Sequence, residues 1–203
     1  MEKVRGRFLN ITNRWHAFDV SHSPPVLLYG LFIFLDVNGN VSSFDIDKHG
    51  RGSGWGISVR PLKQRRLRRN IKAQFLIKPK GEEEIFGVFA MHDDNRKIRV
   101  FRLDLDDLSW KLVEDLGNRV FYMSNTGSFG YTTKVKTMAN KIFFPKFNGD
   151  SIVYYSLETQ KYHSFEGSYS SNNSYDLRRM DLATWTMPTS SSTVDPRESL
   201  AWF

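Results

Sequence analysis

Three copies of one strand–turn–strand pattern constrain the fold of this chain more than any other feature of its sequence. In each copy an apolar strand leads through a polar turn into a second strand that ends in an acid. The second strands align without gaps over residues 41–47, 98–104 and 152–158, at offsets of 57 and 54 residues. A repeat of this length predicts several copies of one supersecondary unit that pack against one another.

The aligned strands carry the same kinds of side chain at the same positions. An apolar residue (Val41, Ile98, Ile152) precedes an aromatic (Phe44, Phe101, Tyr155) and a second apolar residue (Ile46, Leu103, Leu157). An acid follows (Asp47, Asp104, Glu158), and a further aromatic comes later (Trp55, Trp110, Tyr162). Asn38-Gly39 and Asn148-Gly149 stand in the turns of the first and third copies. Asn-Gly is typical of a type I′ hairpin turn, which needs positive φ at both central residues. We expect the acid to begin the next turn.

The repeat predicts an all-β fold, a partial β-propeller of about three four-stranded antiparallel blades. Its period of about 55 residues is close to that of kelch-type propellers, whose blades have four strands. The expected strands are 14–19, 28–35, 40–46 and 56–59; then 73–78, 84–91, 97–104 and 109–113; then 119–124, 141–147, 151–156 and 161–165. The alternative is three unrelated hairpins.

The predicted layout places the blades in residues 30–165. An N-terminal segment, 1–29, is a candidate for the first strand of blade 1, and a Ser/Thr/Asn-rich tail, 166–203, is expected to be mobile. Blade 1 extends to about residue 59, and a basic inter-blade segment covers residues 60–72. Blade 2 covers residues 73–113 and blade 3 covers residues 119–165. Because propellers close with four to eight blades, we expect either a truncated piece of a longer propeller or an additional incomplete blade from the end segments.

Positive charge is concentrated in one stretch of the chain. The 29 Lys and Arg exceed the 22 Asp and Glu by seven, and residues 48–80 hold eleven cations without one acid. A compact cluster within this stretch is our candidate partner-binding or localisation site: Lys63, Arg65, Arg66, Arg68, Arg69. Such a run is typical of a nuclear-localisation signal, a nucleic-acid patch or a solvated linker. The spacing of Leu67, Ile71 and Phe75 also permits a short amphipathic helix. Stackable aromatics are missing from residues 60–72, which disfavours nucleic acid.

Several other classes of protein are disfavoured. The chain has no cysteine, so it has no disulfide or thiolate nucleophile. Its longest apolar run, residues 26–35, is half of the roughly 20 residues that span a bilayer and predicts a buried strand. Met1 is not followed by the apolar core of a secretory signal. We therefore expect a soluble, cytoplasmic or nuclear protein without a membrane partner.

No catalytic, cofactor or metal residues are expected, and the chain is predicted not to be an enzyme. The five histidines lack metal-site spacing, and the glycine-rich residues 50–56 do not match a phosphate loop. The acids near Asp36 and Asp104 lack a twelve-residue calcium loop and are better explained by turns. Glu82, Glu83 and Glu84 are interpreted as a solvated turn. A sugar-processing propeller enzyme is disfavoured on the same grounds.

A longer run of landmarks resembles a family of plant F-box-associated β-propellers. Members share the sequence "FLV…VF.LD…W..V..LGDR.LF", which matches residues 75–77, 100–104, 110–113 and 115–121. Residues 127–129 resemble the family's "GSFS" segment, 140–144 resemble "N.IYF", and 184–188 resemble its closing Trp-x-x-Pro element. The resemblance covers roughly residues 30–188.

The resemblance implies the substrate-recognition propeller of a ubiquitin-ligase adaptor, with a protein substrate as partner and loops on one end of the blades giving specificity. Residues 1–29 depart from the family pattern because they contain no amphipathic helical run of F-box length. Docking of this chain to the ligase scaffold is therefore doubtful. The alternative is a nuclear or nucleic-acid-binding protein that acts through residues 60–72.

Overall fold

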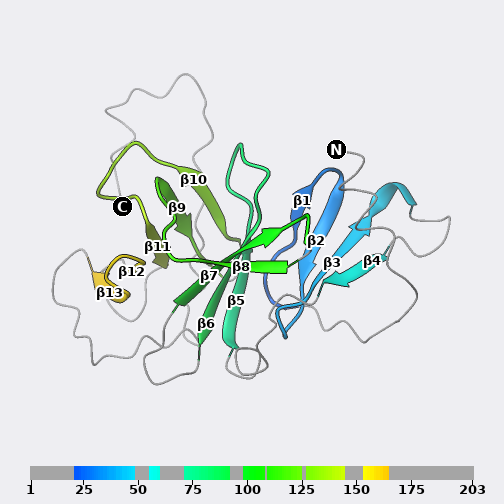
Figure 1. Cartoon of the computed structure of the whole chain (residues 1–203), viewed down its shortest axis with the longest axis horizontal. Helices are drawn as coiled ribbons and strands as arrows, with labels where there is room; N and C mark the ends of the chain where they lie inside the picture. The colour runs from blue at the N-terminus through cyan, green and yellow to red at the C-terminus, as the bar shows by residue number, and fades with distance from the viewer. Residues whose placement is uncertain are drawn as a thin grey trace.

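Three β-sheets follow one another along the chain (Figure 1). The computed structural model describes residues 21–48, 71–91, 98–107, 109–124, 127–144 and 153–164, and the main chain of 55–59. Each of the first two sheets has four strands in sequence order, and the third has five. The second sheet lies between the other two (Figure 1). This is the predicted partial propeller of three blades.

The first sheet begins with a hairpin that the sequence did not lead us to expect. Strand β1 (Val26–Leu28) turns through Tyr29 and Gly30 into β2 (Leu31–Leu35). Both turn residues have positive φ, 50° and 77°, as a two-residue hairpin turn of matching twist requires. The predictions of one strand over 28–35, and of one buried strand over 26–35, were therefore wrong. The predicted strand 14–19 lies outside the described residues.

The turn from β2 to β3 (Val41–Asp45) is organised by Asp36. Its carboxylate accepts hydrogen bonds from the backbone N–H groups of Asn38 and Asn40, at 2.8 and 2.7 Å. Gly39 has φ of 77°, whereas Asn38 does not have positive φ. The turn is thus a three-residue loop with glycine in the left-handed position, and the type I′ prediction was wrong here. Asn148-Gly149 lies outside the described residues. A 3₁₀ turn (Ile46–Lys48) and β4 (Trp55–Val59) complete the first sheet.

The second sheet matches its predicted strands closely. It contains β5 (Ile71–Ile77), β6 (Phe86–Met91), β7 (Ile98–Asp104) and β8 (Ser109–Val113), all paired antiparallel. Because Ile71 and Phe75 lie in β5, the alternative of an amphipathic helix through these residues was wrong. Asp104 begins the turn to β8 as expected, since its Oδ1 accepts the N–H groups of Asp106 and Asp107 at 2.9 and 3.0 Å.

The third sheet has one strand more than predicted. Its members are β9 (Arg119–Tyr122), β10 (Phe129–Thr132), β11 (Lys141–Phe144), β12 (Val153–Ser156) and β13 (Lys161–Ser164), in the order β10-β9-β11-β12-β13. The extra strand β10 returns the chain along β9, so that β11 pairs parallel to β9. Gly130 permits the close pairing, because a Cβ at this position would lie 2.5 Å from Cδ1 of Phe121.

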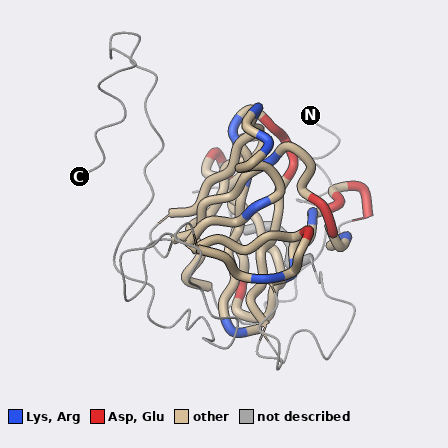
Figure 2. Tube along the Cα trace, turned by 90° about the vertical axis from the view of Figure 1, so that its left-hand side faces the viewer, with Lys and Arg blue, Asp and Glu red and all other residues tan. Residues whose placement is uncertain are grey.

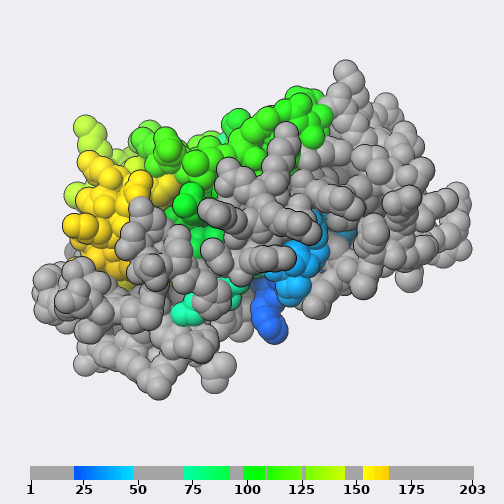
Figure 3. Space-filling model, turned by 60° about the horizontal axis from the view of Figure 1, so that its bottom comes forward, coloured from blue at the N-terminus to red at the C-terminus, as the bar shows by residue number. Residues whose placement is uncertain are grey.

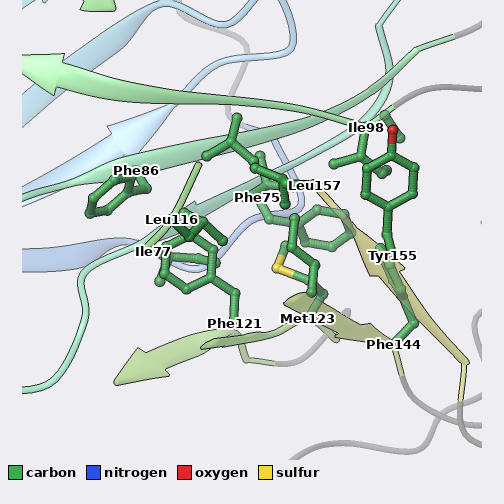
Figure 4. Packing of buried hydrophobic residues seen from close by; sticks show 14 of the residues in the cluster. Phe75, Ile77, Phe86, Ile98, Leu116, Phe121, Met123, Phe144, Tyr155 and Leu157 are labelled. Carbon is green, nitrogen blue, oxygen red and sulfur yellow. The ribbon is translucent and has the colours of Figure 1, made fainter. Parts of the chain in front are cut away.

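Two hydrophobic clusters hold the three sheets together. The first lies between sheets one and two and includes Leu31, Ile33 and Phe89. The second lies between sheets two and three, where residues such as Phe75, Phe121 and Tyr155 pack together (Figure 4). All six residues of β6 are buried, because both faces of the middle sheet are covered.

An ion-pair network also joins the second sheet to the third. Arg119 on β9 donates from Nε to the carboxylate of Glu82 at 2.8 and 3.1 Å, and from Nη2 to Glu84 at 2.6 Å. Its guanidinium lies over the ring of Phe86, 5.2 Å from the centroid. The prediction of a solvated turn was therefore wrong for Glu82 and Glu84, which bind a neighbouring sheet. The prediction of a solvated turn holds for Glu83, whose side chain is 58% exposed.

Candidate interaction surface on the third sheet

The basic cluster proposed from the sequence lies outside the described residues. This applies to Lys63, Arg65, Arg66, Arg68 and Arg69, and to the Ser/Thr/Asn-rich tail. The prediction for these residues stays a prediction. The described part of the chain offers a different surface, which the sequence analysis did not find.

This surface is the face of the third sheet that points away from the second sheet, here called the outward face. The register places one side chain from each of the five strands in a continuous line across it. We call this line the aromatic row: Phe129, Tyr122, Phe143, Tyr154, His163. The neighbouring line on the same face is the lysine row: Tyr131, Val120, Lys141, Ser156, Lys161.

The rings of the aromatic row stack on one another from strand to strand. Tyr122 stacks on Phe129 and on Phe143, with centroids 5.1 and 5.2 Å apart and interplanar angles of 20° and 17°. Phe143 lies 5.4 Å from Tyr154, at 39°, and Tyr154 stacks on His163 at 5.2 Å and 15°. These separations follow the spacing of about 4.8 Å between strands. The faces of the inner rings are therefore turned toward other rings.

Polar groups line the aromatic row. The Nζ of Lys141 lies 4.6 Å from the ring centroid of Tyr154 and donates a hydrogen bond to the carbonyl of Thr137. His163 Nε2 lies 2.8 Å from Thr159 Oγ1. The hydroxyls of Tyr122 and Tyr131 are 3.4 Å apart.

Tyr122 stays neutral at physiological pH. Burial, together with the contact to Tyr131, raises the pKa of Tyr122 far above its usual range. The hydroxyl of Tyr122 therefore adds no negative charge to the row, beside which Lys141 lies.

The third sheet differs in charge from the other two. Its described residues contain one acid, Glu158, and five cations: Arg119, Lys134, Lys136, Lys141, Lys161. The described residues of the first two sheets carry more acids than cations. Figure 2 views the molecule from the end at which the third sheet lies, with Lys and Arg in blue and Asp and Glu in red. Residues 153–164 lie at the molecular surface at this end (Figure 3).

The outward face also differs from the faces on which the sheets pack against each other. The first sheet meets the second through aliphatic residues such as Leu31, Ile33 and Leu35. Neither hydrophobic cluster includes any residue of the outward face. Phe143 is 1% exposed, while Tyr122 and Tyr154 beside it are of intermediate exposure. The face therefore combines a buried aromatic centre with polar margins.

A small cavity lies between the second and third sheets. It has a volume of about 120 Å³ and is lined by residues that include Val113, Glu114 and Leu157. A cavity of this volume has room for about one side chain. We therefore regard it as secondary to the outward face.

No catalytic or metal centre emerges from the described residues. Within them, no three His, Cys, Asp or Glu side chains come together as metal ligands. The carboxylate of Asp36 accepts a backbone hydrogen bond within its own turn, and so does the carboxylate of Asp104. The same part of the chain contains no helix with the length and apolar character needed to cross a membrane.

The aromatic row was missed because it depends on register. Tyr122 and His163 are 41 positions apart in the sequence and come to lie in one row only through three successive strand pairings. The available signal was the aromatic residue in each strand of the third copy. The parallel pairing of β9 with β11 could not be inferred from that signal.

Comparison with known families gives a match over most of the chain. The model of the KIB1-4 beta-propeller family matches residues 6–170, more than three quarters of the chain. A search of curated proteins found no similar sequence.

Proposed function

The chain belongs to the KIB1-4 beta-propeller family, and from this membership we propose that it is a non-catalytic module that binds a protein partner. One observation carries the proposal, namely the outward face of the third sheet. Tyr, Phe and Arg are enriched at protein interfaces, and this face has three tyrosines, Tyr122, Tyr131 and Tyr154. Strand pairing and ring stacking hold these side chains in place before a second protein binds, which lowers the entropic cost of binding.

Affinity capture followed by reconstitution tests this function. The full chain is used as bait, and each captured protein is purified and titrated against the chain. We expect Tyr154→Ala/His163→Ala to weaken that binding at least tenfold, because tyrosines at interface centres often contribute about 2 kcal/mol. The matched control is Ile46→Ala/Leu112→Ala, at residues that are 57% and 50% exposed in the 3₁₀ turn after β3 and on β8. Binding that is equal in both double variants contradicts the role of the outward face.

We further propose that the bound partner is a substrate of a ubiquitin ligase. The support is the resemblance of residues 75–77, 100–104 and 110–121 to F-box-associated propellers. The half-life and ubiquitination of the captured partner are measured in cells with and without the chain. A shorter half-life with the chain supports the adaptor role, and an unchanged half-life contradicts it.

A second candidate function is a nuclear one that acts through residues 60–72. The observation that favours it is the run of eleven cations without an acid between Lys48 and Lys80. Replacing four arginines with Gln in a fluorescent fusion tests it: Arg65, Arg66, Arg68, Arg69. A nuclear signal that is lost in the variant supports localisation by this segment, and an unchanged distribution contradicts it.

A further inference from the structure

We propose that the loop between β10 and β11 binds an acidic segment of the protein partner. The loop consists of residues 133–140 and joins two strands of the third sheet. Four consecutive residues at its tip are exposed to solvent: Lys134, Val135, Lys136, Thr137. The inference rests on the proposed function and names the chemistry of the partner at a second place on the third sheet.

The lysines of the loop are not neutralised by the protein itself. In the described part of the chain neither Lys134 nor Lys136 forms an ion pair, whereas Lys111 on β8 binds Asp107 at 2.7 Å. The described residues 127–144 contain no acid at all. Carboxylates of a partner therefore complement two free ammonium groups, and they meet no like charge on this part of the sheet.

The main chain of the loop is held in one shape before a partner binds. At its start, the N–H of Thr133 donates to the carbonyl of Asn118 at 2.8 Å. At its end, the N–H of Asn140 donates to the carbonyl of Arg119 at 2.9 Å. Between them the carbonyl of Val135 accepts two backbone hydrogen bonds from within the loop, at 3.0 and 3.2 Å. A loop fixed in this way loses little backbone entropy when it binds.

An apolar side chain stands between the two lysines. Val135 is 55% exposed, and no other large hydrophobic residue in the described part of the third sheet is exposed. Contact with an apolar side chain of the partner would remove Val135 from water and so favour binding. The segment that fits therefore carries an apolar side chain among its acids.

The same composition disfavours nucleic acid, which is the other common polyanion. Residues 133–140 contain no aromatic ring on which an unpaired base could stack. Lys134 and Lys136 supply about two phosphate contacts, fewer than tight binding of nucleic acid requires. Val135 gains nothing from a phosphate.

Probe molecules test this inference with the purified full chain. The acidic probe is Glu-Ser-Leu-Ser-Glu-Ser-Leu-Ser-Glu, in which acids and leucines share one side when the peptide is extended. A serine probe replaces each Leu with Ser, a basic probe replaces each Glu with Lys, and an oligothymidylate of similar length represents nucleic acid. Binding is followed by fluorescence anisotropy. We expect the acidic probe to bind most tightly and to weaken at high salt, because the lysines are exposed charges.

A pair of double variants connects that binding to the loop. Lys134→Gln/Lys136→Gln is expected to weaken the acidic probe about tenfold, since two ion pairs with the probe are lost. Its unfolding midpoint should stay unchanged, because neither lysine pairs with an acid of the described chain. Lys78→Gln/Lys111→Gln makes the same charge change at two residues that pair within the second sheet and its turns. This control should bind the probe as the parent does.

A single variant tests the apolar contact separately from charge. Val135→Ser is expected to weaken the acidic probe about threefold and to leave the weaker binding of the serine probe unchanged, because only the leucines lose a contact. An equal effect on both probes would show that Val135 does not contact the segment.

Three further results overturn the inference: equal affinity for the basic probe, equal loss in the two double variants, or tighter binding of oligothymidylate. Its failure can be told apart from failure of the proposed function. If a captured partner loses affinity for Tyr154→Ala/His163→Ala but binds Lys134→Gln/Lys136→Gln as it binds the parent, the loop does not contact it. The module function then stands and the acidic segment does not.

Discussion

The indole of Trp110 donates a hydrogen bond from Nε1 to the backbone carbonyl of Gly39, at 3.1 Å. The two residues are 71 positions apart and belong to different sheets: Trp110 lies on the outer strand of the second and Gly39 in the β2–β3 turn of the first. The ring of Trp110 also packs edge-on against Phe89, with centroids 5.9 Å apart. One side chain therefore connects the hydrophobic cluster to a turn of the neighbouring sheet.

Replacing Trp110 with Phe separates these two contributions. The variant keeps an aromatic ring against Phe89 but leaves the Gly39 carbonyl without its donor, so we expect a loss of about 1–3 kcal/mol in the free energy of unfolding. Urea denaturation measures it. Leu112→Ala, on the same strand at 50% exposure, is the control and should change stability by less than about 0.5 kcal/mol. A Trp110→Phe variant as stable as the parent would show that the hydrogen bond contributes nothing.

Glycine at position 87 is required by close packing. A Cβ there would lie 2.6 Å from Cε2 of Phe89 and 2.9 Å from Cη2 of Trp110. Gly87→Ala should therefore cost about 1–3 kcal/mol through overpacking, measured by thermal unfolding. At Gly127 an added Cβ meets nothing within 4 Å, so Gly127→Ala serves as the matched control. Equal midpoints for the two variants would disprove the close approach.

Arg119 should contribute more to stability than an exposed ion pair of similar length. Its partners Glu82 and Glu84 have side chains that are 19% and 34% exposed, while Lys111 and Asp107 are 47% and 62% exposed. We expect Arg119→Gln to cost about 1–2 kcal/mol and Lys111→Gln to cost clearly less, because the Lys111–Asp107 pair is exposed to solvent. Chemical denaturation of both variants checks this order. The reverse order would mean that the network does not hold the sheets together.

Because of Asp104, the free energy of unfolding should depend on pH in the acid range. Hydrogen bonds from the backbone N–H groups of Asp107 and Asp106 hold the pKa of Asp104 below its ordinary value. Because the folded state favours the ionised carboxylate, its contribution is present above the unfolded pKa of about 4 and is lost as pH falls through the lower folded value. Asp104→Ala should therefore be less stable than the parent at neutral pH, with a difference that shrinks below about pH 4.

Unfolding free energies measured from neutral to acid pH test this dependence. The control is Leu112→Ala, at an exposed residue of β8 without an ionisable side chain, whose difference from the parent should not change with pH. A difference between Asp104→Ala and the parent that stays constant into acid would contradict the account.

The sequence predicted the parts of the fold that depend on local pattern. The strands of the second sheet followed from apolar alternation and from clear turns such as that of Asp104. The hairpin at Gly30 was missed because an unbroken apolar run hides a turn that only the φ values of Tyr29 and Gly30 make evident. Strand β10 was missed because Gly130 lacks the side chain on which an apolar pattern depends.

The candidate surface was beyond prediction for a different reason. The aromatic row joins residues from five strands, so it exists only after the pairing order β10-β9-β11-β12-β13 is known. A repeat identifies equivalent strands, such as those that carry Phe101 and Tyr155. It does not say which face of the last sheet remains without a neighbouring described sheet, and that face carries the proposed function.

Hydrogen exchange measured by mass spectrometry, on the full chain with and without its captured partner, tests the central claim most directly. The account predicts that the partner slows amide exchange in residues 127–144 and 153–164, which contribute most of the outward face, and leaves β6 of the middle sheet unchanged. Protection that is confined to the first and second sheets, with no change in the third, would contradict it.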